Sequence, residues 1–147
     1  MREMKSLLVI FALLTGNAQT ANSLEIPDEH LQPVIEGLIS CYGTLNALAN
    51  MFDEDSMSGT AESARSSARD SKYSAQWLMS MRDGATKTLG EYNQYVDSAS
   101  YGAYYNMTMA LENNDKEMQS LMIGICHELN PMQVLIEQDI RKQSYLK

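Results

Sequence analysis

The chain has 147 residues and a formal net charge of −8. This length suits a single domain that buries a core of its own. The acidic charge excludes nucleic acid and anionic membrane surfaces as expected partners, because both are bound through basic patches. An acidic surface would suit a basic protein partner, and it also serves to keep a protein in solution.

Residues 1–18 have the order of a cleavable signal peptide: a short basic start, the apolar run 7–14, and small residues leading to a cleavage point after Ala18. The apolar run is too short for a membrane span, which needs about 20 residues. No later stretch is apolar enough for one. We therefore expect export to the periplasm or the exterior, and one helical domain over residues 19–147.

Apolar residues recur every three or four positions along this domain, which is typical of amphipathic helices. The pattern predicts helices over residues 28–52, 60–82, 86–111, 115–129 and 131–145. No segment shows the strict alternation of an exposed strand. The sequence therefore predicts an all-α fold, an antiparallel four-helix bundle, in which the last helix is kinked or split at Pro131.

The sequence contains two cysteines, Cys41 and Cys126. An even count in an exported chain favours a disulfide, and their wide spacing excludes a C-x-x-C redox pair. Cys41 lies as far before the end of the first predicted helix as Cys126 lies after the start of the fourth. In an up-down-up-down bundle those positions share one level, so we predict a bridge, which would stabilise the fold by about 4.5 kcal/mol. Two buried free thiols are the alternative.

We expect no catalytic, metal or cofactor site. The serines lie outside any Gly-x-Ser-x-Gly setting, and the two histidines, His30 and His127, lie at the margins of the apolar faces. Met118 and Met122 share a helix face, but this face belongs to the predicted core, where methionine serves packing. The protein is therefore not predicted to be an enzyme, and a ligand-, haem- or copper-binding bundle is kept as an alternative.

Two predicted helices carry a second apolar stripe, opposite the stripe that faces the core. The first consists of Tyr73, Trp77 and Met81, and the second of Tyr101, Tyr105 and Met109. A bundle helix needs only one buried face, and outward aromatic and methionine side chains are typical anchors of protein interfaces. The alternative is that the segment after Pro131 folds over one of the stripes.

Together these features predict an exported protein that binds another protein by covering part of its surface. The expected interface combines the two stripes with the acidic loop Asp53, Glu54 and Asp55. This format resembles periplasmic immunity and inhibitor proteins that neutralise cell-wall-degrading toxins, although no motif is shared with them. The main alternative is a self-associating structural or assembly component of an envelope or secreted complex, which would form a homo-oligomer.

Overall fold

Four α-helices make up most of the described chain. The computed structural model describes residues 25–145, so the predicted signal peptide lies outside it. The elements are α2 (Asp28–Glu54), α3 (Ser58–Arg82), the short 3₁₀ turn η1 (Leu89–Tyr92), α4 (Asn93–Glu112) and α5 (Lys116–Tyr145). This part of the chain has no strand, and none of its helices is long and apolar enough to cross a membrane. The predicted all-α fold is confirmed.

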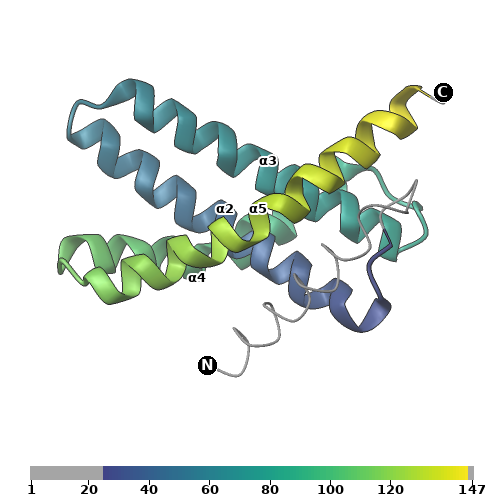
Figure 1. The fold of residues 1–147 in the computed structure, drawn as a ribbon, viewed down its shortest axis with the longest axis horizontal. Coiled ribbons are helices and arrows are strands. Elements are labelled where there is room, and N and C mark those ends of the chain that lie inside the picture. The colour runs from purple at the N-terminus through teal and green to yellow at the C-terminus, as the bar shows by residue number, and fades with distance from the viewer. Residues whose placement is uncertain (1–24, 146–147) are drawn as a thin grey trace.

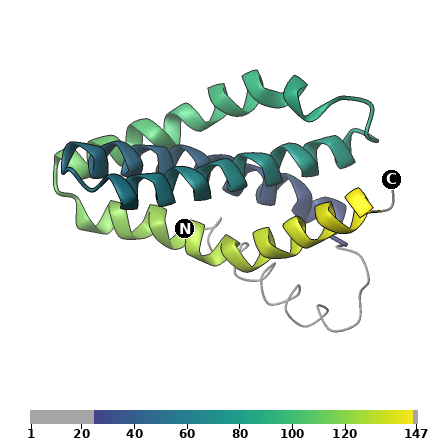
Figure 2. The same ribbon diagram turned by 90° about the horizontal axis from the view of Figure 1, so that it is seen from above.

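The helices differ from the predicted ones mainly at two places. Residues 86–88 are not helical, because the backbone N–H of Thr88 is bonded to the Glu91 carboxylate at 2.6 Å and caps η1 instead. This bond also lowers the pKa of Glu91. α5 is continuous through Pro131, and Figure 2 shows that its ribbon bends midway. Of the two predicted outcomes the kink is confirmed and the split is wrong, since proline removes one hydrogen bond without ending the helix.

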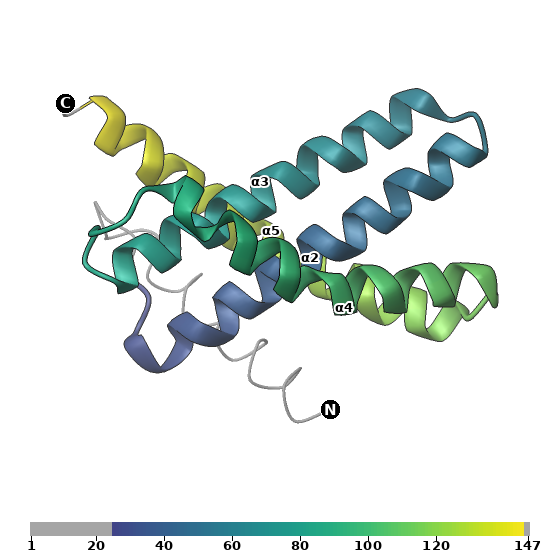
Figure 3. The ribbon, with the colours of Figure 1, turned by 180° about the vertical axis from the view of Figure 1, so that it is seen from behind.

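The four helices form two antiparallel hairpins that cross each other. One hairpin consists of α2 and α3, and the other of α4 and α5. Figures 1 and 3 show that the tips of the two hairpins diverge, whereas α5 passes over the first hairpin in its second half. α2 is the central element, because its contacts with α3 and α4 are far more extensive than those between any other two α-helices. The fold is thus a helical bundle whose two hairpins separate toward their tips.

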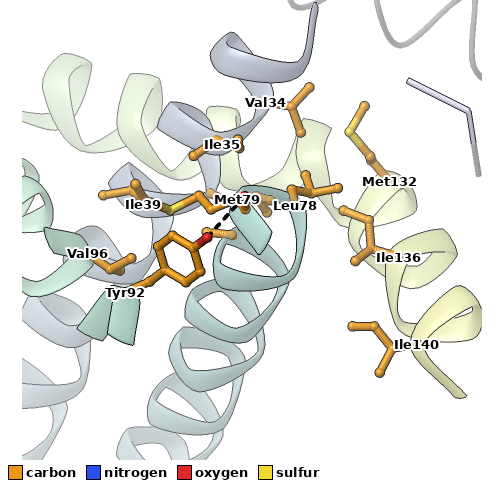
Figure 4. Packing of buried hydrophobic residues seen from close by; sticks show 12 residues of the cluster. Val34, Ile35, Ile39, Leu78, Met79, Tyr92, Val96, Met132, Ile136 and Ile140 are labelled. Carbon is orange, nitrogen blue, oxygen red and sulfur yellow. Dashed lines mark hydrogen bonds between the residues drawn. The ribbon is translucent and has the colours of Figure 1, made fainter. Parts of the chain in front are cut away.

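The hydrophobic core lies where the hairpins cross. Its buried residues are Val34, Ile35, Leu38, Ile39, Ala75, Leu78, Met79, Tyr92, Val96, Met132, Ile136 and Ile140. Figure 4 shows these side chains converging from α2, α3, α4 and the second half of α5. The Tyr92 hydroxyl donates to the Asp83 carboxylate at 2.7 Å, and burial raises the pKa of Tyr92. This bond secures the connection between α3 and α4.

Gly43 allows the backbones of α2 and α4 to touch. A Cβ atom placed on Gly43 would overlap with the carbonyl oxygen of Ser100 and would lie 2.9 Å from the amide nitrogen of Tyr104. It would also lie 3.2 Å from the Cβ of Ala103. Since the overlap is with backbone rather than with a flexible side chain, no rotamer change could relieve it. Only glycine fits at this crossing point.

α5 is fixed to α2 within the same stretch of chain. A Cβ on Gly37 would lie 2.7 Å from the Cδ1 atom of Leu129, so this side chain packs directly on the α2 backbone. Cys41 and Cys126 form the predicted disulfide, with their Cα atoms 5.3 Å apart. The segment between Gly37 and Gly43 therefore holds both helices of the second hairpin.

We predict that Gly43→Ala lowers the free energy of unfolding by about 1–3 kcal/mol, as overpacking does, despite the better helix propensity of alanine. Urea denaturation followed by far-ultraviolet circular dichroism measures this difference. The matched control is Gly124→Ala in α5, where an added Cβ meets no described atom within 4 Å. Equal stability of the two variants would contradict the close contact at Gly43.

Candidate protein-interaction surface

α4 has one face turned to the interior and one face turned to solvent. Val96, Ser100, Met107 and Ala110 are buried on the inner face. Next to them, the side-chain amide of Asn50 in α2 donates to the Tyr104 hydroxyl at 2.8 Å. Together with the Gly43 contact, this bond fixes the rotation of α4 about its own axis and so decides which residues are left outside.

The outer α4 face consists of exposed residues only: Tyr95, Ser98, Ala99, Tyr101, Gly102, Tyr105, Asn106 and Met109. Four of them are large, with exposed fractions of 52% for Tyr95, 66% for Tyr101, 52% for Tyr105 and 36% for Met109. The predicted stripe from Tyr101 to Met109 is therefore exposed as expected. Tyr95 was not predicted, although it lies seven residues before Gly102 and so on the same face of the helix.

No charged residue lies between Asp97 and Glu112. In a chain with a net charge of −8, the outer α4 face is thus an uncharged area that displays three tyrosines and a methionine. Groups of exposed large apolar side chains mark interaction sites more often than scattered single ones do. This absence of charge, together with the exposed rings, distinguishes the outer α4 face from the acidic remainder.

The α3 stripe is only partly exposed. Tyr73 and Met81 face solvent, but Trp77 between them is half-buried and packs against the core. The Trp77 indole N–H is buried and has no hydrogen-bond partner within residues 25–145. The expectation that Trp77 points outward is wrong, because α3 contacts both α2 and α5 and its buried face is therefore wider than one stripe.

The structure does not join the two stripes into one surface. Tyr73 and Met81 lie in the half of α3 that leads into the connection to α4, whereas the stripe on α4 lies toward the tip of the second hairpin. Figure 1 shows these halves on different sides of the crossing point. Past Pro131, α5 buries Met132 and Ile136 in the core and leaves the outer α4 face uncovered.

The acidic loop occupies a third location, at the tip of the first hairpin. Asp53 forms an ion pair with Arg65 of α3, so part of its charge is already matched within the chain. Glu54 and Asp55 are exposed. Because the two hairpin tips diverge, this loop lies apart from the outer α4 face. The loop and the face would have to contact different parts of a partner.

The first half of α5 is more exposed than predicted. Met118 and Leu121 continue the stripe that is buried further along the helix, yet both are about as exposed as Met109. Met122, which shares this face, is half-buried. The placement of Met118 in the core is wrong, because the second hairpin leaves the first one before its tip and nothing from α2 or α3 covers that end.

A polar cluster joins α2, α3 and α4 next to the core. The Lys72 ammonium lies 2.6 Å from the Asp97 carboxylate and 5.2 Å from the centre of the Tyr42 ring. The Tyr42 hydroxyl donates to the same carboxylate at 3.1 Å, and burial raises the pKa of Tyr42. These groups satisfy one another and connect three helices, so their arrangement serves to hold the helices together.

The described residues contain no group of three or more His, Cys, Asp or Glu side chains that could hold a metal ion. His127 is exposed, and His30 lies 3.4 Å from the Glu29 carboxylate near the start of α2. Comparison with protein-family models, curated proteins and solved structures finds no match to this chain. The surface therefore has to be interpreted from its own residues.

We predict that truncation destabilises the protein at Trp77 but not at Tyr105. Trp77→Ala removes packing against the core and should lower the free energy of unfolding by about 2–4 kcal/mol. Tyr105→Ala changes an exposed position and should stay within about 0.5 kcal/mol of the unchanged protein. Thermal and urea denaturation of the two variants, in dilute solution, measure both values. A large loss for Tyr105→Ala would show that its ring is part of the core.

Proposed function

We propose that this protein acts by binding another protein through the outer α4 face. The observation that carries the proposal is the group of four large exposed side chains, Tyr95, Tyr101, Tyr105 and Met109, on a helix face without charge. Tyrosine and methionine are enriched where proteins bind one another, and charged residues are depleted at the centre of such interfaces. The protein would then work by covering a surface, without a chemical step.

The way α4 is held supports this role. Gly43 and the Asn50–Tyr104 hydrogen bond fix the helix, so its outer side chains are presented on a rigid element. Tyrosine side chains also have few rotatable bonds, so ordering them costs little entropy. Binding by such a surface loses less free energy to ordering than binding by a mobile loop would.

The second part of the proposal concerns the compartment. A disulfide between Cys41 and Cys126 is typical of proteins that fold outside the reducing cytosol. Residues 1–18 have the composition of a signal peptide, although they lie outside the described residues. We infer that the protein is exported and acts in the periplasm or outside the cell, where a covering role resembles that of inhibitor proteins.

A basic partner fits only one part of the surface. Glu54 and Asp55 at the tip of the first hairpin are exposed and would attract basic groups. The outer α4 face contains no carboxylate from Tyr95 to Met109, and the nearest one along it is Glu112 at the end of the helix, so a basic patch would find little opposite charge there. For this reason we place the main contact on the outer α4 face. The acidic tip would contribute only long-range electrostatic attraction of the partner.

We predict that the triple variant Tyr101→Ser/Tyr105→Ser/Met109→Ser loses association at least about 30-fold, since two or three anchors contribute most of the energy of an interface. Its circular dichroism spectrum should be unchanged, because all three positions are exposed. Capture by the immobilised protein from exported fractions, followed by titration of each captured protein, measures the effect.

The matched control is Tyr73→Ser/Met81→Ser, which removes two exposed apolar side chains from α3 instead. This variant should bind as the unchanged protein does. If the control loses binding and the α4 variant keeps it, the interface lies on α3 and the proposal is contradicted.

A further inference from the structure

We propose that the partner of the outer α4 face is a second copy of this chain, bound through antiparallel packing of α4 against α4 around a two-fold axis near Gly102. This inference depends on the proposed function, because it names the occupant of the same surface. Three observations carry it: the arrangement of residues about Gly102, the open space at Gly102, and the distribution of charge.

The exposed side chains are arranged symmetrically about Gly102. Positions three, four and seven residues away on a helix share one face, and on both sides of Gly102 these positions are exposed and uncharged. They are Ala99, Ser98 and Tyr95 on one side, and Tyr105, Asn106 and Met109 on the other. A two-fold axis through the centre of such a face pairs each position with its counterpart on the opposite side.

In an antiparallel pair centred on Gly102, each large side chain of one copy would pack against either a large or a very small side chain of the second copy. Tyr95 would contact Met109 of the second copy, a ring against a thioether, which is a favourable contact. Tyr105 would lie over the methyl group of Ala99, and Ser98 would face the Asn106 amide. Each of these contacts occurs twice, so the helix face supplies a self-complementary set of contacts.

Gly102 has no role within the described part of one chain. A Cβ added there meets no described atom within 4 Å, although glycine destabilises a helix interior relative to alanine. The contact on the inner face of α4 shows what a glycine at a helix crossing does, since Gly43 of α2 lets the two backbones touch there. At Gly102 a second backbone could approach equally closely, with the large side chains on either side of the crossing.

The charge distribution favours a second copy over a basic protein. Two chains that each carry −8 repel each other except where their facing surfaces lack charge. The outer α4 face is such a surface, because its exposed positions from Tyr95 to Met109 carry no charge and Glu112 lies beyond its end. A basic partner would instead be drawn toward the exposed carboxylates elsewhere on the molecule.

Gly124 in α5 provides the contrast. It is also in a helix interior, and a Cβ there would also meet no described atom within 4 Å. However, the positions around it include Glu117 and Glu128, so two copies of that face would place four carboxylates in one interface, without basic partners opposite them. Both Gly102 and Gly124 therefore have open space around them. Of these two glycines, only Gly102 also has uncharged neighbours that are arranged symmetrically on the helix face.

The test is sedimentation equilibrium of the protein expressed from its full coding sequence, compared with Gly102→Leu and with Gly124→Leu as the matched control. We expect the unchanged protein and Gly124→Leu to dimerise. Gly102→Leu should weaken the dimer at least about 30-fold, as loss of an interface centre does. Its melting temperature at concentrations where all three proteins are monomeric should not fall, because the leucine enters open space.

Cysteine cross-linking tests the register. Tyr95→Cys should form a disulfide-linked dimer only when it is mixed with Met109→Cys, because the proposed axis places these two positions opposite each other. The native cysteines are already bonded to each other and would not interfere. Cross-linking of Tyr95→Cys with itself would indicate parallel packing and would overturn the proposed axis.

The outcomes also separate this inference from the proposed function. A monomeric protein that captures a different protein, and loses it in the Tyr101→Ser/Tyr105→Ser/Met109→Ser variant, would overturn the second copy as partner and keep the outer α4 face as the binding surface. A monomeric protein that captures nothing through this face would overturn both.

Discussion

The contact between the backbones of α2 and α4 at Gly43 is the constraint on which the rest of the structure depends. Because no Gly43 side chain separates the two helices there, the α4 backbone at Ser100 and Tyr104 packs directly on α2, which positions α4 and sets its rotation. The residues on its inner face, such as Ser100 and Met107, are buried by this choice. The same orientation of α4 leaves the residues on the opposite face, with Gly102 at their centre, exposed to solvent.

The other stabilising features are concentrated around this crossing and become sparse toward the hairpin tips. Gly37 and the Cys41–Cys126 disulfide hold α5 on α2 next to Gly43, and the apolar core begins in the same stretch of α2. Beyond the crossing the hairpins diverge, so Met118 is exposed although its pattern continues a core stripe. Stability and the proposed binding surface are thus separated in space, and an exposed residue of α4 can change without loss of the fold.

Much of the fold follows from the sequence, because helical periodicity and cysteine spacing are local patterns. The four helices, the kink at Pro131 and the disulfide were all predictable in this way. The crossing of the hairpins was not, since a regular bundle and a crossed pair of hairpins have the same local pattern. The burial of Trp77 and the exposure of Met118 depend on this crossing, and both differ from the prediction for that reason. The exposure of Tyr101, Tyr105 and Met109 was predictable, because these residues lie opposite the stripe that packs on α2.

The central claim is that α4 lies on Gly43 with its inner face and leaves its outer face free within one chain. Nuclear Overhauser effects in dilute protein test it most directly. A strong effect between the α protons of Gly43 and the methyl group of Ala103 is expected, together with none from the Tyr105 ring to α2 or α3. An absent Gly43–Ala103 effect, or effects from the Tyr105 ring to α2, would mean that α4 is rotated and would contradict the claim.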